Sequence, residues 1–122
     1  MATKKNLGTG LDLLLSANAP NRLGNPEGTE INRAQSLFEQ AITQEEEGQM
    51  FEAYYLYRRV IDSLELAQSL SGAAKLYSQA CNNLAIILHE GGEIQSAITY
   101  LEKALRSYPD NSIARENLLA IC

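Results

Sequence analysis

The sequence has little of what enzymes, nucleic-acid-binding proteins and membrane-associated proteins use most. It contains one histidine and two cysteines, and its 10 lysines and arginines are outnumbered by 15 aspartates and glutamates, for a net charge of −5. An acidic balance supplies no basic surface for nucleic acid or an anionic membrane. Two distant thiols, Cys81 and Cys122, form neither a disulfide framework nor a metal site. We therefore expect no cofactor, no metal ion, and neither nucleic acid nor a membrane among the partners.

Residues that favour β-strands are also scarce. Tryptophan is absent, there are two phenylalanines and few valines, and the three prolines leave long stretches uninterrupted. Such usage favours helix over sheet. With 122 residues, of which 45% are apolar, the chain can form one domain with a real hydrophobic core. Disorder of the whole chain is excluded.

The N-terminus superficially resembles a secretory signal peptide, because two lysines precede a leucine cluster and the string Ala17-Asn18-Ala19. Asp12 interrupts the apolar segment, and Pro20 stands directly after the apparent cleavage site. The uninterrupted apolar run covers only 13–15, whereas a membrane span needs about 20 residues. We expect a cytoplasmic protein.

Motifs for catalysis are missing. The single histidine, His89, has no serine or cysteine beside it in a nucleophile motif. The glycines of 7–10 are not followed by the G-K-[ST] of a phosphate loop. The acidic run 45–47 cannot converge on one metal, since consecutive helical residues point in different directions. The sequence predicts that this protein is not an enzyme.

The chain divides into two parts by amino-acid composition and periodicity. Residues 1–29 are rich in glycine and proline around a short leucine-rich motif, which predicts a mostly extended tail. From Thr29, a candidate N-cap, apolar residues recur at helical spacing to the end of the chain. The last helix is expected to be capped by Asn111 or Ser112. The expected helices are 29–47, 49–70, 73–90, 93–107 and 112–122.

Two segments share a frame of glycine, four residues, then alanine: Gly48 to Ala53 and Gly92 to Ala97. The glycine permits the left-handed backbone that ends a helix, and the alanine lets two antiparallel helices approach closely. The two glycines lie 44 residues apart. We interpret the excess over a 34-residue repeat as extra turns on the second and third helices.

Counted from Ser78, the chain resembles the tetratricopeptide repeat (TPR) family, whose pattern is W-x2-L-G-x2-Y, A-x3-F, A and P. A weaker repeat starts at Ala34, and a third start falls at Ser112. The resemblance implies an all-α fold over 30–122: antiparallel helical hairpins stacked as a short right-handed solenoid, with repeats at about 34–67 and 78–111 and a capping helix at 112–122. The eight matching positions of the strong repeat are Cys81, Leu84, Ala85, Leu88, Ala97, Leu101, Ala104 and Pro109.

In this family the first helices of successive repeats line a concave groove that binds peptides. The resemblance implies that Asn83 grips a peptide backbone through its carboxamide, although Asn83 could instead make a polar contact between helices. Ile86 and Phe38 would form the apolar floor, and Glu39 and Glu90 would select charge. The implied groove residues are Gln35, Phe38, Glu39, Ile42, Gln79, Asn82, Asn83, Ile86, His89, Glu90 and Asn117.

The groove positions also include Glu45 and Glu46, and they carry no lysine or arginine. The resemblance therefore disfavours a clamp for a peptide carboxylate. Acidic groove positions favour a basic or mixed apolar and basic ligand.

The tail reads Lys4-Lys5-Asn6-Leu7-Gly8-Thr9-Gly10-Leu11-Asp12-Leu13-Leu14-Leu15. This string resembles the N-terminal peptide of ParB-type partition proteins, in which basic residues precede L-G-x-G-L-D-x-L-L. That resemblance implies docking to a ParA/MinD-type ATPase, with Lys4 or Lys5 acting at the nucleotide interface and Leu11, Leu14 and Leu15 docking. Alternatively, the leucines form one helical turn that covers the exposed first hairpin, since TPR arrays usually need three repeats for stability.

The sequence thus predicts a non-enzymatic interaction module that binds a peptide or helix of a partner protein. Two alternatives stay open. One is an adaptor of a ParA/MinD-type partition or positioning system, whose tail docks and stimulates the ATPase. The other is a structural homodimer that shares exposed hairpin edges.

Overall fold

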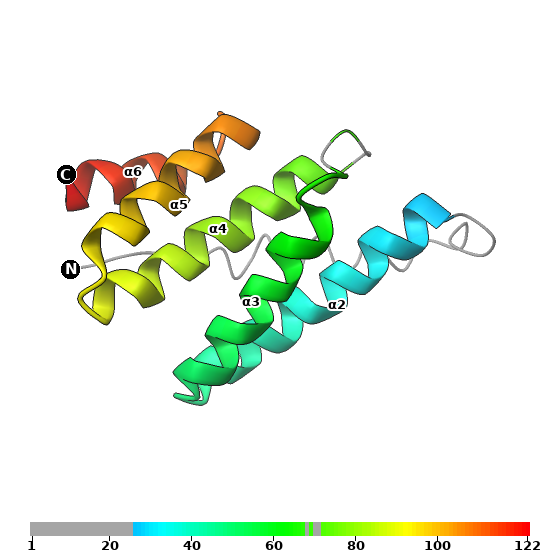
Figure 1. The fold of residues 1–122 in the computed structure, drawn as a ribbon, viewed down its shortest axis with the longest axis horizontal. Helices are drawn as coiled ribbons and strands as arrows, with labels where there is room; N and C mark the ends of the chain where they lie inside the picture. Colours follow the sequence, from blue (N-terminus) through cyan, green and yellow to red (C-terminus); the bar gives the residue numbers. More distant parts are fainter. Residues whose placement is uncertain (1–25, 68, 70–71) are drawn as a thin grey trace.

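The computed structural model describes residues 26–67, 69 and 72–122, and all regular structure within them is α-helical. Consecutive helices pack against each other along the chain (Figure 1). The all-α prediction is confirmed for this part of the molecule. The helices are α2 (Pro26–Glu46), α3 (Met50–Leu64), α4 (Ala73–Glu90), α5 (Ile94–Ser107) and α6 (Ser112–Ile121).

The turns that close the two hairpins, α2–α3 and α4–α5, are built alike. Gly48 and Gly92 adopt φ values of +82° and +87°, a region in which a residue with a Cβ is strained. The next residue in each turn donates its backbone N–H to a carbonyl five residues back, at 2.8 Å in both cases. These are Schellman caps, which satisfy the last carbonyls of one helix and reverse the chain. The predicted role of the two glycines is confirmed.

The core lies where the hairpins face each other, with α4 at its centre. Every residue of α4 from Leu76 to Ile86 is buried. Ala53 and Ala97 are fully buried, which allows the two helices of each hairpin to approach closely. Helices α2 and α6 each make weak contacts with α4, so the first helices of successive hairpins lie along one side of the stack.

Helix α6 is fixed by the residue before it. The Asn111 side-chain oxygen accepts the backbone N–H of Ala114 at 3.0 Å, so Asn111 is the N-cap rather than Ser112. The Asn111 amide also donates to the Ser78 hydroxyl at 2.8 Å, and that hydroxyl donates to the Ala104 carbonyl at 2.7 Å. One polar cluster therefore joins α4, α5 and α6.

Two predicted helix boundaries are wrong. The first helix begins at Pro26 rather than Thr29. Proline suits the first turn of a helix, because the backbone N–H that it lacks would have no partner there. Helix α3 ends at Leu64 instead of continuing to residue 70, and Leu66 is 98% exposed, with no core to pack on. The 44-residue spacing between Gly48 and Gly92 therefore includes a non-helical connection after α3. It also includes residues 73–77, which begin α4 and precede the repeat start at Ser78.

The leucine-rich motif and the basic residues of the tail lie outside the described residues.

Candidate functional site

A row of buried polar side chains crosses four helices. The Asn117 amide of α6 donates to the Asn82 carbonyl oxygen at 2.9 Å, and the Asn82 amide donates to Asn83 at 3.2 Å. The Asn83 amide donates to the Tyr57 hydroxyl of α3 at 3.2 Å, and this hydroxyl donates to Glu45 Oε1 of α2 at 2.8 Å. None of the five residues is more than 3% exposed. We call this row the amide network.

The electrostatics of the amide network fix the direction of its hydrogen bonds. Burial, and then the neighbouring Glu45 carboxylate, raise the pKa of Tyr57 far above its ordinary value. The hydroxyl therefore stays protonated and donates to Glu45 at any physiological pH. Since a neutral hydroxyl also has lone pairs, it can accept from Asn83 at the same time. The network thus connects the first hairpin to the second without a labile proton.

Two of the sequence-predicted groove residues belong to the hydrophobic core. Phe38 is fully buried and packs edge-to-face on Tyr57, with ring centroids 5.9 Å apart and an interplanar angle of 61°. Ile42 is 6% exposed and lies in the same cluster. Ile86 is also buried, yet it lies outside the described cluster of core residues. All three side chains are therefore closed to solvent in this structure.

Two glutamines occupy the second position of the two predicted repeats, Gln35 in the middle part of α2 and Gln79 in the middle part of α4. Gln35 of α2 is 2% exposed and Gln79 of α4 is 3% exposed. The Gln35 Nε2 donor and the Gln79 Oε1 acceptor find no hydrogen-bond partner among the described residues. An unpaired buried amide atom costs about 1–3 kcal/mol. Gln79 also lines a pocket of about 190 Å³ beside Asn111 at the start of α6.

The predicted charge selectors do not share one surface. Glu39 lines a pocket of about 300 Å³ between α2 and α3, where burial and then the Glu46 charge raise its pKa. Glu90 is exposed and lines a different cleft, between α3 and the end of α4. His89, beside it, is half-buried in the last turn of α4. The structure therefore brings together the asparagines of the predicted site but separates its acidic residues.

The Cys81 thiol is placed as a core side chain. It is fully buried within α4, and burial raises its pKa to about 12, against the opposing effects of the Lys103 charge and the Tyr77 hydroxyl. A thiol with this pKa is almost entirely protonated near neutral pH and is a poor nucleophile.

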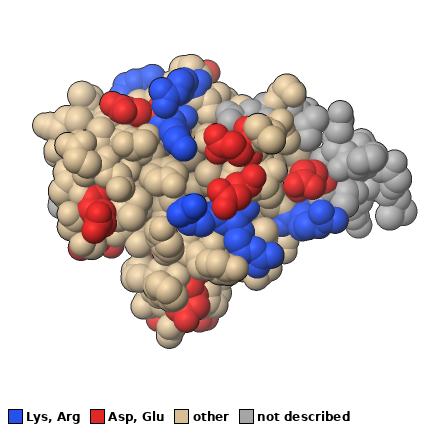
Figure 2. Space-filling model, viewed as in Figure 1, with Lys and Arg blue, Asp and Glu red and all other residues tan. Residues whose placement is uncertain are grey.

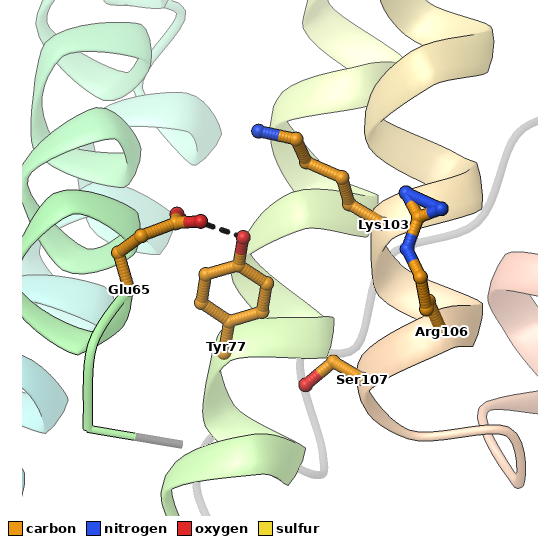
Figure 3. A pocket seen from close by; sticks show the side chains of 5 residues that line it. All are labelled: Glu65, Tyr77, Lys103, Arg106 and Ser107. Carbon is orange, nitrogen blue, oxygen red and sulfur yellow. Dashed lines mark hydrogen bonds between the residues drawn. The ribbon is translucent and has the colours of Figure 1, made fainter.

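A polar pocket of about 270 Å³ lies between the end of α3 and α5 (Figure 3). Tyr77 of α4 projects into it and donates to Glu65 Oε1 at 2.9 Å. Lys103 and Arg106 enter from α5, beside Ser107 (Figure 3). Burial chiefly raises the pKa of Tyr77, which keeps its hydroxyl a donor. One carboxylate, Glu65, and two cations, Lys103 and Arg106, line this pocket.

A larger cleft of about 650 Å³, which the sequence did not indicate, lies between the start of α3 and the turn from α4 to α5. The available signal was Phe51, an aromatic residue that stands off the buried stripe of its own helix. The lining residues are Met50, Phe51, Tyr54, Ile87, Glu90, Gly91 and Glu93.

The stacked hairpins, their repeated glycine turns and the polar row along the first helices define an α-helical repeat protein. Two family models for the tetratricopeptide repeat match the chain, at residues 78–111 and 35–63, and together they cover just over half of it. The chain belongs to the TPR family. The first match spans the same residues, 78–111, as the predicted strong repeat. Searches of curated proteins and of solved structures found no match.

Repeats of this family are generally protein–protein interaction modules and typically have no enzymatic activity. Interaction with another protein is therefore the class of function that the family assigns. Among the described residues, every helix is too short or too polar to cross a bilayer.

Proposed function

We propose that this protein is a non-enzymatic interaction module that binds a segment of a partner protein along its first helices, α2, α4 and α6. The observation that carries the proposal is the pair of glutamines at equivalent repeat positions. Each has one amide atom without a partner among the described residues, a donor at Gln35 and an acceptor at Gln79. An extended peptide backbone offers both complementary groups at regular spacing.

The asparagines contribute to this function through position. Because Asn82, Asn83 and Asn117 are hydrogen-bonded across α3, α4 and α6, they hold the first helices at a fixed separation. A rigid row of helices keeps the two glutamines at a constant spacing and lowers the conformational cost of binding. In this proposal Asn83 is a positioning residue, and the backbone contacts come from Gln35 and Gln79.

Ile86 is fully buried and closed to a partner, whereas Ile113 is half-buried and lines the pocket beside Gln79, where it offers an apolar contact. The net charge of −5 favours a partner segment that carries lysine or arginine. The ligand we propose is therefore a basic segment with apolar side chains.

The test is an exchange of both glutamines for methionine, which has nearly the same shape but no amide. Because each glutamine has an unpaired buried atom, Gln35→Met with Gln79→Met leaves the melting temperature unchanged or raises it. Binding weakens about tenfold, measured by quantitative affinity capture from native extract and then by the Kd of the purified partner. Gln95→Met, at an exposed position of α5, is the matched control. Equal binding by the double variant and the control contradicts the proposal.

A second candidate function rests on the sequence of the tail, which lies outside the described residues. We propose that Lys4, Lys5 and the leucines Leu11, Leu14 and Leu15 dock a ParA/MinD-type ATPase, which makes the protein an adaptor. A synthetic peptide of residues 1–20 then raises the turnover of such an ATPase from the same organism, and Lys4→Ala with Lys5→Ala abolishes the stimulation. The homodimer alternative is tested by sedimentation: a mass that stays that of a monomer at all concentrations excludes it.

A further inference from the structure

Helices α3 and α4 lie close together at the connection that joins them and diverge toward their other ends (Figure 1). The cleft of about 650 Å³ lies where they have separated, between the first turns of α3 and the turn that leads from α4 to α5. Its position depends on the splay between the two hairpins. It includes the end of α4, but it contains neither Gln35 nor Gln79, on which the proposed function rests.

The side chains that form the cleft are mainly apolar, and several are unusually exposed. Phe51 is 80% exposed and Met50 is 38% exposed, while Ile94 next to the cleft is 40% exposed. Tyr54 and Ile87 are half-buried and form the floor. Large apolar side chains that gather around a depression mark sites where another apolar group is buried.

The fold does not need Phe51 where it stands. The buried stripe of α3 contains Ala53, Tyr57, Val60, Ile61 and Leu64. Phe51 precedes Ala53 by two residues, which is about 200° around a helix, so it projects from the opposite face. A phenylalanine on the outer face of an amphipathic helix buries little apolar surface on folding, and it buries that surface when a partner covers it.

The rim of the cleft is acidic. Glu90, at the end of α4, and Glu93, at the start of α5, are both exposed and line it. No residue that the structure describes in the lining is a lysine or arginine. The nearest arginine along α3, Arg58, donates to the Tyr54 hydroxyl at 3.1 Å and is thereby held against that ring.

On the face that Figure 2 shows, acidic and basic side chains lie interspersed, with no large area of one sign. The rim of the cleft carries two exposed carboxylates, and charge complementarity there favours a cation.

The geometry points to a second docking surface at this cleft, for an amphipathic segment of a partner protein that carries an apolar anchor flanked by lysine or arginine. The anchor is buried against Phe51, Met50 and Ile87, and the cations face Glu90 and Glu93. This surface includes neither Gln35 nor Gln79, so the protein can hold two segments at once.

The test uses a synthetic 14-residue amphipathic peptide of leucine and lysine, with the sequence LKKLLKLLKKLLKL, labelled for fluorescence anisotropy. Its counterpart has glutamate in place of lysine. The full chain binds the lysine peptide and does not bind the glutamate peptide. Phe51→Ser weakens binding about thirtyfold, as expected for an aromatic anchor. Glu90→Gln with Glu93→Gln weakens it a further severalfold and reduces its dependence on salt.

Two matched controls separate this cleft from non-specific attraction. Leu119→Ser removes an apolar side chain that is 75% exposed on α6, and Glu102→Gln removes an exposed carboxylate on α5. Both leave the affinity within twofold. Amide chemical shifts of the wild-type chain, recorded by NMR, change around Phe51 and Glu93 when peptide is added. This second measurement does not depend on any variant.

Four results overturn the inference. The first is an equal loss of affinity with Phe51→Ser and Leu119→Ser. The second is a pattern of shift changes that avoids the cleft and follows the first helices or the tail. The third is a dimer of the free protein that Phe51→Ser dissociates, since a second copy of the chain is then the occupant. Tight binding of the glutamate peptide likewise contradicts the charge argument.

Discussion

Replacing Tyr57 by phenylalanine tests whether the amide network stabilises the fold. The substitution keeps the edge-to-face contact with Phe38 and removes only the hydroxyl, which donates to Glu45 at 2.8 Å and accepts from Asn83 at 3.2 Å. A hydrogen bond to a charged group contributes about 1.5–3 kcal/mol and a neutral one about 0.5–1.5 kcal/mol. We therefore expect Tyr57→Phe to lower the free energy of unfolding by about 2–4 kcal/mol.

That loss is a large fraction of the 5–15 kcal/mol typical of a domain. Urea unfolding followed by circular dichroism measures it, as a lower midpoint with an unchanged slope. The control is Tyr55→Phe on the same helix, since Tyr55 is 60% exposed and a surface change costs less than about 0.5 kcal/mol. If the two variants unfold at the same urea concentration, the reasoning about the network is refuted.

The same residue gives the stability a pH dependence. The pKa of Tyr57 is raised in the folded state, mainly by burial, so folding favours the neutral phenol. The stabilisation is complete below the unfolded pKa of about 10 and is lost as the pH rises above it. Between pH 9 and 11 the wild-type chain therefore loses more stability than Tyr57→Phe does. Equal losses in the two proteins would contradict the assignment.

Three further substitutions or reactions test other parts of the fold. Asn111→Ala removes the cap of α6 and a buried hydrogen bond to α4, and lowers the free energy of unfolding by about 2 kcal/mol. Gly92→Ala lowers the free energy of unfolding by about 1–2 kcal/mol, because alanine is strained at φ +87°; the added Cβ itself meets open space. Gly91→Ala, at a residue with φ −87°, leaves the free energy of unfolding nearly unchanged. Cys122 is exposed and reacts with iodoacetamide within minutes, whereas Cys81 reacts only as the protein unfolds, which mass spectrometry of the labelled chain distinguishes.

The helical hairpins could be predicted because their signals are local. The glycine before each second helix is needed for a positive φ, and the alanine five residues later is needed for close packing. Both can therefore be recognised from the sequence. The end of α3 could not be predicted in this way. Leu64, Leu66 and Ala67 continue an apolar composition, and only the absence of a facing surface ends the helix at Leu64.

The site was harder to predict because it depends on contacts between helices. Tyr57 and Glu45 lie on opposite sides of a turn, and their hydrogen bond follows from the way α2 and α3 face each other. The repeat position of Asn83 marked it as a candidate site residue, but nothing in the sequence marked its partner on α3, Tyr57. The cleft beside Phe51 exists only because the two hairpins splay, and the spacing of residues in the sequence does not indicate the angle between the hairpins.

The amide network also limits how this protein could be lengthened. A duplicated hairpin placed between α3 and α4 would separate Asn83 from the Tyr57 hydroxyl, so the insert would have to carry its own tyrosine and asparagine to restore both junctions. A hairpin added beyond Ile121 leaves every bond from Asn117 to Glu45 in place. Growth of the array is therefore easier at its C-terminal end than in its middle, and a longer designed version should be built outward from α6.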